Sequence, residues 1–328
     1  MLESVVKGSE MSRKIDVFVR EVGMRDGLQS VQEFMPTEAK KAWCSAEAAA
    51  GVPEIEVCSF VPPKLLPQFS DAGEVVAHAL RIPGLTVAAL MPNLKGAERG
   101  IEAGVHKLNY VVSVSESHNR ANVRRSRAES IEDFGRIAAI VRTLPAARRP
   151  KLAAGLATAL GCTIEGNVAE AEVVRVAVAL AEAGADELAV SDTVGYADPA
   201  SVRRIIKAVM AAVGRVTVTA HFHDTRGLGL ANVLAALDVG VRHFDASLAG
   251  LGGCPWAPGA TGNIVMDDLV FMLEAMGMRT GVDVEKLVAV REIVARALPH
   301  VPLHGGIAKA GLPKGFHPAA AAPQRLSA

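Results

Sequence analysis

Two histidines separated by one residue are the strongest chemical signal in this chain. His221 and His223 end an apolar run that begins at Val216, and Asp224 follows them. Side chains two apart on a strand point to the same side, so both imidazoles can meet one ion. The alternative is a pair of hydrogen-bonded core histidines. We favour metal ligation, and with oxygen ligands the pair suits Mg, Mn or another octahedral divalent ion better than structural zinc.

An adjacent arginine and aspartate end the first apolar run. Arg25 and Asp26 lie in EVGMRDGLQ, residues 21–29, between Gly23 and Gly27. Asp26 can bind a cation, Arg25 presents fixed donors to a developing oxyanion, and the glycines let the backbone turn sharply. An isolated Arg-Asp-Gly sequence is more often a surface turn. Because a metal held by the histidines needs oxygen ligands from other strand ends, we interpret Asp26 as one of them.

A glycine-rich segment, AGLGGCPWAPGATGN, covers residues 249–263. So many glycines predict a loop of special conformation, and a phosphate cradle or a flexible connection is the alternative interpretation. Cys254 within it is positioned like a loop-borne acid or base. Asn263 offers a neutral oxygen to a metal.

The elements that position these motifs follow a regular alternation. Short β-branched or apolar runs recur about every 25 to 40 residues, each followed by an alanine-rich stretch of helical spacing. The predicted strands are Ile15–Val22, Glu54–Ser59, Leu85–Met91, Lys107–Val112, Lys151–Ala157, Glu187–Ser191, Val216–His223 and His243–Leu248. Eight strands predict an α/β (β/α)8 TIM barrel, whose chemistry lies at the C-terminal strand ends. A doubly wound sheet is the alternative fold, but no first strand leads into G-x-G-x-x-G.

Helix signals complete this organisation. Thr37 is predicted to cap a helix that runs to Ala50, with Gly51 just beyond its end. Further helices are predicted over Ala171–Ala183, Pro199–Val213, Leu228–Val239, Asp267–Met276 and Val284–Ala297. We therefore divide the chain into an N-terminal lead (1–14), a barrel domain with C-terminal helices (15–298) and an irregular tail (299–328).

Composition narrows the classes of partner. The 328 residues contain 35 basic and 35 acidic side chains, so nothing favours nucleic acid or an anionic membrane, and a small molecule is the expected partner. Four widely spaced cysteines form neither a CxxC pair nor a secreted framework. With no signal peptide or long apolar run, the chain is expected to be cytoplasmic.

Six ordered strings carry a resemblance to a known family. They are EVGMRDGLQ, SFVPPKLLPQ, MPNLKG, SDTVGYADP, HFHDTRGLGLAN and GLGGCPWAPGATGN. Together, from about Val17 to Val282, they closely resemble 3-hydroxy-3-methylglutaryl-CoA lyase of the DRE-TIM metallolyase superfamily. The resemblance implies a metal-dependent retro-Claisen cleavage of an acyl-CoA to acetyl-CoA and a keto acid, which is acetoacetate for the family substrate.

The resemblance also implies residue roles. By position, the metal ligands are Asp26, His221, His223 and Asn263, the enolate-stabilising arginine is Arg25, and the catalytic loop cysteine is Cys254. Asp192 and Glu56 match acidic residues near the site. We further predict that Gln29, Gly155 and His118 contact the substrate, and that the protein is a homodimer.

Departures from the family pattern concern the substrate. The family commonly has a tyrosine where this chain has Gly155, in GLATALGC at residues 155–162. Losing a ring and a hydroxyl leaves open a different or bulkier acyl group, or a citramalyl-type CoA thioester. Met24 replaces a proline and Asp267 a glutamate, both milder changes.

Two rival functions remain to be weighed. An aldolase or acyltransferase of the same superfamily would form rather than break a carbon–carbon bond, and Cys254 in GGCPWAPGA argues against it. A catalytically inactive barrel acting as a binding protein would be expected to lose metal ligands or Arg25, and all of them are present.

Overall fold

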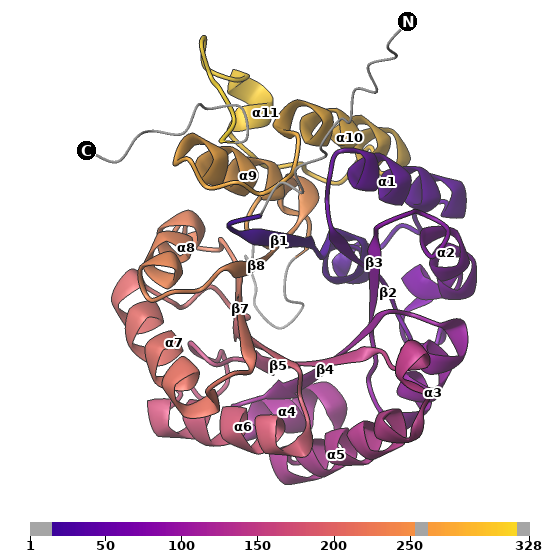
Figure 1. Cartoon of the computed structure of the whole chain (residues 1–328), viewed down its shortest axis with the longest axis vertical. Helices are drawn as coiled ribbons and strands as arrows, with labels where there is room; N and C mark the ends of the chain where they lie inside the picture. The colour runs from indigo at the N-terminus through magenta and orange to yellow at the C-terminus, as the bar shows by residue number, and fades with distance from the viewer. Residues whose placement is uncertain (1–14, 253–261, 320–328) are drawn as a thin grey trace, which may run out of the picture.

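The chain folds around a closed barrel of parallel strands. The structure is a computed structural model, which describes residues 15–252 and 262–319. Eight strands pair in sequence order, and β1 pairs in turn with β8, which closes the ring. Viewed down the barrel, the strands surround the centre and the helices form an outer ring (Figure 1). The predicted (β/α)8 TIM barrel is confirmed.

Each predicted strand is present. Their bounds are β1 Phe18–Glu21, β2 Glu54–Ser59, β3 Thr86–Leu90, β4 Lys107–Ser113, β5 Lys151–Ala157, β6 Glu187–Asp192, β7 Thr217–Phe222 and β8 His243–Ala246. Most strand residues are buried, as expected where helices cover the outer face and side chains fill the interior.

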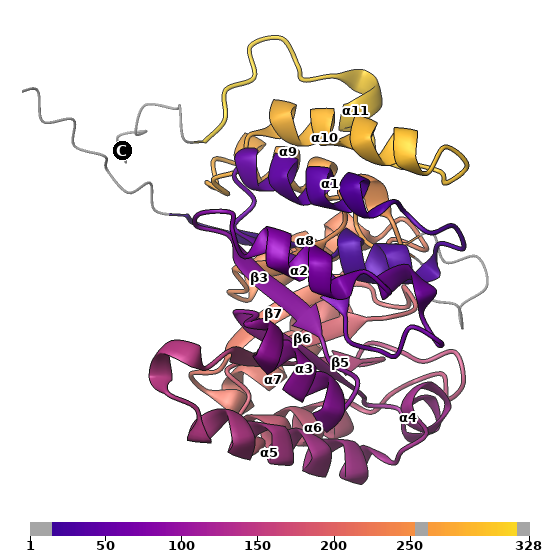
Figure 2. The ribbon, with the colours of Figure 1, turned by 90° about the vertical axis from the view of Figure 1, so that its right-hand side faces the viewer.

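The helices alternate with the strands and then continue past β8. They are α1 Thr37–Ala49, α2 Ala72–Ala79, α3 Leu94–Ala103, α4 Glu116–Val123, α5 Arg127–Thr143, α6 Glu170–Ala183, α7 Pro199–Val213, α8 Gly229–Asp238, α9 Met266–Ala275, α10 Val284–Ala297 and α11 Ile307–Ala310. Figure 2 shows α1 lying along α10, so a helix that follows the barrel packs on the first helix of the barrel. Among the described residues, no helix is both long and apolar enough to cross a bilayer.

Two local predictions were wrong. Thr37 does not cap α1, because Pro36 occupies the N-cap position in an extended conformation and no side chain caps the helix. The tail predicted as irregular contains the single helical turn α11, whose first amides, at Gly306 and Ile307, donate to the carboxylate of Asp268. Gly51 lies beyond α1 with φ +99°, as predicted.

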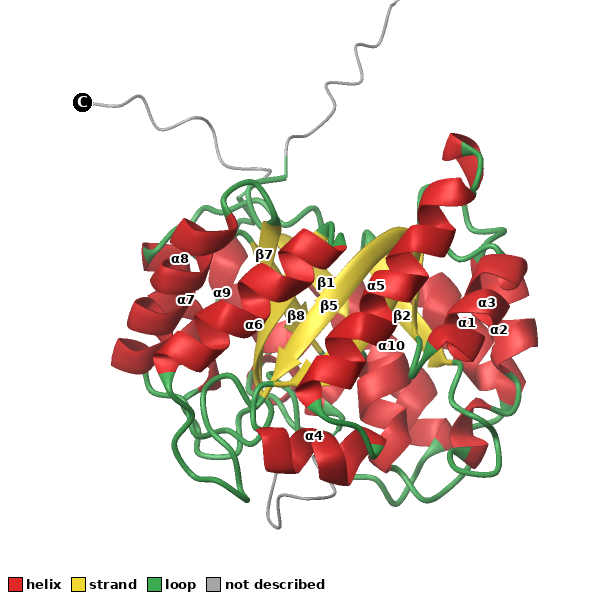
Figure 3. Ribbon diagram, turned by 90° about the horizontal axis from the view of Figure 1, so that it is seen from below, coloured by secondary structure: helices red, strands yellow, loops and turns green. Residues whose placement is uncertain are grey.

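The barrel has a charged base and a functional mouth. Arg20, Glu54, Lys107, Glu187 and Asp245 form one ion-pair network inside the barrel, around a cavity of about 10 Å³, the space of about one water molecule. At the other end, toward which the β5 arrow points, α4 lies across the barrel (Figure 3). Arg25, which follows β1, and Asp192, which ends β6, lie at this C-terminal end.

Candidate metal and catalytic site

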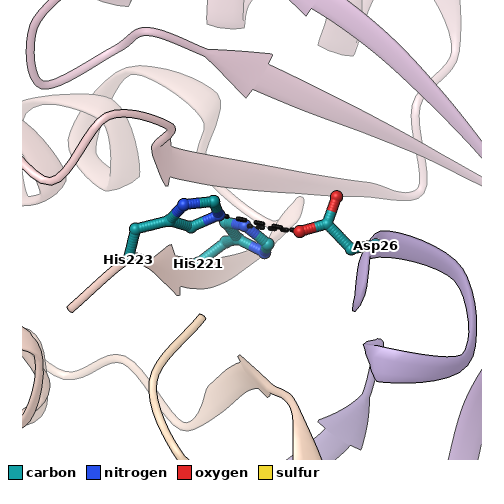
Figure 4. A group of neighbouring side chains, drawn as sticks. All are labelled: Asp26, His221 and His223. Carbon is teal, nitrogen blue, oxygen red and sulfur yellow. Dashed lines mark ion pairs between the residues drawn. The ribbon is translucent and has the colours of Figure 1, made fainter. Parts of the chain in front are cut away.

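One carboxylate and two imidazoles meet at the mouth of the barrel. Asp26 follows β1, while His221 and His223 belong to the end of β7, and their ligand atoms all lie within 4.8 Å of one another (Figure 4). Asp26 Oδ2 is 3.9 Å from His221 Nε2 and 3.6 Å from His223 Nε2. All three residues are buried. The sequence prediction that both histidines face one site together with Asp26 therefore has the required geometry.

Strand geometry aims the two histidines. Their ring centroids are 5.2 Å apart on the same side of β7, with Phe222 between them buried on the other side. His221 Nδ1 lies 3.1 Å from Asp245 Oδ2, which leaves Nε2 facing Asp26. Burial would lower the pKa of His221, but the carboxylates of Asp245 and Asp26 together raise it.

Asn263 is brought to the site by a short bridge to β7. It pairs with His223 in an antiparallel bridge, flanked by hydrogen bonds from Asp224 N to Gly262 O and from Ile264 N to Phe222 O. Its Nδ2 donates to Asp26 Oδ2 at 2.8 Å, and its Oδ1 is buried with no hydrogen-bond partner. Rotating the amide by half a turn exchanges these atoms and presents an oxygen beside Asp26.

Asp26 is fixed by the turn that carries it. Residues Gly23–Gly27 form a single π-helical turn, of a kind often found at functional sites. Arg25 Nη1 and Gln29 Nε2 donate to Asp26 Oδ1 at 2.6 and 2.8 Å, which leaves Oδ2 for the histidines. Burial would raise the pKa of Asp26, but Arg25 and the histidines lower it well below its usual range.

Gly23 serves close packing rather than a sharp turn. Neither Gly23 nor Gly27 has a positive φ. A Cβ on Gly23 would lie 2.4 Å from Ser247 Oγ, so the end of β1 approaches the end of β8 without room for a side chain. The glycines allow the two catalytic strand ends to meet.

Arg25 is held from two sides. Its Nε donates to Glu56 Oε2 at 2.6 Å, and Asn109 Nδ2 donates to Glu56 Oε1 at 2.7 Å. Arg25 Nη2 makes no hydrogen bond to any other described residue, so this donor remains available for a ligand. Glu56 therefore orients the guanidinium.

The donor set fits a divalent cation. Ligands of an octahedral ion at about 2.1 Å lie about 3 Å apart when adjacent and about 4.2 Å apart when opposite. The separations from Asp26 Oδ2 to the imidazoles fall within this range. Rotation of the Asn263 amide would add an oxygen beside Asp26 Oδ2, in exchange for the hydrogen bonds that its Nδ2 now donates to Asp26 and Leu251. Two nitrogens and two oxygens without thiolate match Mg, Mn or a similar ion.

Asp192 ends β6 beside β7. It is fully buried, and its carboxylate accepts the backbone N–H groups of Tyr196 and Ala197 at 2.8 and 3.1 Å. Burial raises the pKa of Asp192, against the lowering effect of those amides and of the two histidines. The carboxylate thus shapes the loop after β6 and lies within electrostatic reach of the metal ligands.

Gly155 lies at the height of His221. Gly155 pairs with Ala189, and Ala189 pairs with Thr219 two residues before His221. In a barrel of this kind, each strand is shifted by about one residue relative to its neighbour. Over the two steps from β5 to β7 this shift is two residues, so Gly155 lies in the same layer as His221. A Cβ on Gly155 would meet Val111 Cγ2 at 3.6 Å and Tyr110 O at 3.7 Å, which are ordinary contacts. The position could carry a side chain, and its absence widens the barrel beside the metal ligands.

His118 belongs to the helix across the mouth. It lies on α4, and its Nδ1 is 2.8 Å from Ser113 Oγ at the end of β4. Its Nε2 is buried without a partner, and burial lowers the pKa of the imidazole, which favours the neutral form. Contact between His118 and a substrate stays a prediction.

The glycine-rich loop is described at its two ends. Gly250, Gly252 and Gly262 have φ values of +67°, +102° and +112°, as the sequence predicted for a loop of special conformation. Cys254 lies outside the described residues, and its proposed role is not placed by the structure.

Sequence reasoning missed several supporting residues. Asn109 donates a hydrogen bond to Glu56, and Asp245 lies in hydrogen-bond contact with His221. Glu21 accepts hydrogen bonds from the backbone N–H groups of Gly23 and Leu248. The sequence did contain a signal for Asp245, because it lies two residues after His243 and both side chains are therefore on the same face of β8, the inner one. Glu21 had none, because its partner Leu248 is 227 residues away in the sequence.

Comparisons with known proteins agree with this geometry. The HMGL-like family model matches residues 16–294. The hydroxymethylglutaryl-CoA lyase of Bacillus subtilis is 39% identical over 86% of this chain and 95% of its own length. A Pseudomonas aeruginosa enzyme named 3-hydroxy-3-isohexenylglutaryl-CoA/hydroxy-methylglutaryl-CoA lyase is 40% identical over 82% of this chain and 88% of its own.

A solved structure extends the similarity to three dimensions. The HMG-CoA lyase of Acinetobacter baumannii, in complex with coenzyme A and 3-methylmalate, superposes with a TM-score of 0.85 at 39% identity. The match covers 92% of this chain and 97% of that one. Family model, relatives and structure agree, and the chain belongs to the HMGL-like family of carbon–carbon lyases.

Proposed function

We propose that this chain catalyses the retro-Claisen cleavage of 3-hydroxy-3-methylglutaryl-CoA or a close 3-hydroxyacyl-CoA congener to acetyl-CoA and a keto acid. The observation that carries the proposal is the meeting of Asp26, His221 and His223 beside the clamped guanidinium of Arg25. Carbon–carbon cleavage toward a thioester needs an activated hydroxyl and a stabilised enolate. The site offers a group for each task.

Each residue is assigned one part of the reaction. Asp26, His221, His223 and Asn263 would hold a divalent cation, Mg or Mn, which supplies Lewis-acid polarisation of the C3 hydroxyl. Asp192 accepts the hydroxyl proton, since burial raises the pKa of this carboxyl. The C2–C3 bond breaks, its electrons pass to the thioester as an enolate, and Arg25 donates to the enolate oxygen. Cys254 returns a proton to C2.

The acyl group is proposed to be bulkier at C3 than methyl. The β5 residues on the side of the metal ligands are Gly155 and, two residues further, Ala157. Neither fills the space at the height of the histidines. The similar Pseudomonas aeruginosa enzyme carries isohexenylglutaryl-CoA in its name, and isohexenyl is larger than methyl. We therefore expect a congener with a larger C3 substituent to be cleaved at least as well as 3-hydroxy-3-methylglutaryl-CoA. A citramalyl-type thioester, which is not larger at C3, is a separate alternative substrate.

A panel of thioesters tests this function. The protein is stripped of metal with a chelator, assayed for acetyl-CoA release from each 3-hydroxyacyl-CoA, and assayed again after Mg²⁺ or Mn²⁺ is added. The proposal is supported if acetyl-CoA release requires the cation and its rate depends on the C3 substituent of the thioester. No release from any member, with the protein folded and the cation bound, contradicts it.

A further inference from the structure

The imidazole of His221 rests on a carboxylate on the side away from the metal ligands. Its Nδ1 is 3.1 Å from Asp245 Oδ2, and both residues are buried. Because a carboxylate only accepts, Nδ1 must carry the imidazole proton in the neutral ring. Nε2 is then bare and faces Asp26 Oδ2 at 3.9 Å. The hydrogen bond therefore selects the tautomer that can bind a cation.

Asp245 is itself gripped by an arginine from the neighbouring strand. Arg20 Nε and Nη2 donate to the two carboxylate oxygens at 2.7 and 2.9 Å. The two strands pair directly, with Arg20 opposite Asp245. This bidentate grip fixes the plane of the carboxylate and hence the direction in which it meets His221.

Below Arg20, toward the base of the barrel, lie the other charged residues of the ion-pair network. Arg20 Nη1 donates to Glu54 at 3.1 Å and to Glu187 at 3.3 Å, and Lys107 pairs with both carboxylates. Three carboxylates and two cations leave one formal negative charge. Only Asp245, among the members of this network, contacts a predicted metal ligand.

We propose that Asp245, held by Arg20, is a positioning residue that sets the tautomer and orientation of His221 and thereby the cation affinity of the site. The inference rests on the metal centre of the proposed function. A carboxylate behind a ligating histidine raises its basicity and fixes its ring, and loss of such a partner typically costs about 10-fold to 100-fold in metal affinity.

Two variants of equal charge change separate this role from general electrostatics. Asp245→Asn removes the charge and turns an amide N–H₂ toward either Arg20 or His221. Glu54→Gln removes one charge from the same network without touching His221. Mn²⁺ binding to the whole chain is measured by calorimetry and by electron paramagnetic resonance without substrate, and folding by thermal unfolding. We expect the Mn²⁺ dissociation constant to rise about 10-fold to 100-fold in Asp245→Asn and less than about 3-fold in Glu54→Gln.

The outcomes are distinct. Unchanged Mn²⁺ affinity in folded Asp245→Asn overturns this inference while leaving the metal centre in place. Equal weakening in both variants also overturns it, because the charge of the network would then be the cause. An unmodified chain that binds no Mn²⁺ overturns the metal centre and this inference together.

A measurement on the unmodified protein covers the case in which Asp245→Asn does not fold. In metal-free protein labelled with ¹⁵N-histidine, the imidazole signals of His221 are assigned by their loss in His221→Ala. At a pH at which the ring is neutral, they are expected to show a protonated Nδ1 and an unprotonated Nε2. The opposite tautomer overturns the inference.

Discussion

Asp26 divides its two carboxylate oxygens between two tasks. Oδ1 accepts from Arg25 and Gln29, and Oδ2 faces His221, His223 and Asn263. If Asp26 Oδ2 holds a cation, this one side chain would place the cation next to the guanidinium of Arg25. In the proposed reaction, the groups assigned to hydroxyl activation and to enolate stabilisation would then lie side by side, as cleavage between C2 and C3 requires.

The histidine pair should be needed for cation binding rather than for folding. His221→Ala and His223→Ala are each expected to weaken Mn²⁺ binding and to reduce turnover by at least about 100-fold, because each removes one of four ligands. Calorimetry and steady-state kinetics measure the two effects. Unchanged turnover with metal still bound contradicts the ligand assignment.

Arg25→Lys should fail although it keeps the charge. A lysine cannot donate to Glu56, Asp26 and a substrate oxygen from one planar fork. We expect kcat to fall about 100-fold, in line with the loss of about 3 kcal/mol of transition-state stabilisation. Arg203→Lys, on the surface beside Asp238, is the matched control and should be near normal. Near-normal kcat in Arg25→Lys removes Arg25 from the mechanism.

Gly155→Tyr should narrow the acyl pocket. A ring beside the layer of His221 fills the space proposed for a larger C3 substituent and adds a hydrogen-bond donor. The ratio of kcat/KM should shift toward 3-hydroxy-3-methylglutaryl-CoA by about 10-fold to 200-fold relative to a bulkier congener. Gly155→Ala, whose Cβ makes only ordinary contacts, should change this ratio little. If the unmodified enzyme already prefers the methyl substrate, the idea of altered specificity is wrong.

At the scale of elements, Glu21 joins the two loops of the site. Its carboxyl accepts the backbone N–H of Gly23 in the Arg25–Asp26 turn and of Leu248 at the start of the glycine-rich loop. Glu47 of α1 lies against it, and no described donor reaches the Glu47 carboxyl with hydrogen-bond geometry. A protonated Glu47 can donate a hydrogen bond to Glu21, so the two neighbouring buried carboxyls do not both carry a charge. Asp267 of α9 also faces the pair, with its own charge offset by Arg291 of α10.

This pair predicts a pH-dependent stability. Burial raises the pKa of Glu21 to about 7, and burial together with Glu21 raises the pKa of Glu47 well above its usual range. The folded state therefore binds more protons than the unfolded chain, and stability falls as pH rises from about 4.5 through 7. Glu47→Gln should lose fewer degrees of Tm than the unmodified protein across this window. Glu38→Gln, exposed on the same helix, is the control, and parallel Tm profiles contradict the shared proton.

Local sequence predicted the elements well and their contacts poorly. Strands β2 and β5 have the predicted bounds, and each begins directly after a proline, Pro53 and Pro150, which marks its start in the sequence. The histidine pair and Asp26 come together because they lie at or just after strand ends, which the barrel brings to one place, and Asn263 joins them through its bridge to His223. The hydrogen bond of Asp245 to His221 and the pairing of Glu21 with Glu47 could not be predicted, since both depend on how the barrel closes and packs.

At the scale of the molecule, the seam where β1 pairs with β8 runs from the base of the barrel to its mouth. Arg20 and Asp245 pair across this seam, and Gly23 meets Ser247 at its upper end. The C-terminal helices α9 and α10 cover the same side, where α10 packs on α1. The site is thus assembled from both ends of the chain. A homodimer and a cytoplasmic location stay predictions.

Product stoichiometry tests the central claim most directly. Metal-stripped protein is mixed with a 3-hydroxy-3-methylacyl-CoA, Mg²⁺ or Mn²⁺ is added, and both products are followed by nuclear magnetic resonance. We predict that acetyl-CoA and the matching keto acid appear in equal amounts only after the cation is added, and that His223→Ala forms neither at a comparable rate. Equal rates with and without the cation, or acetyl-CoA without a keto acid, would contradict a metal-dependent carbon–carbon lyase at this site.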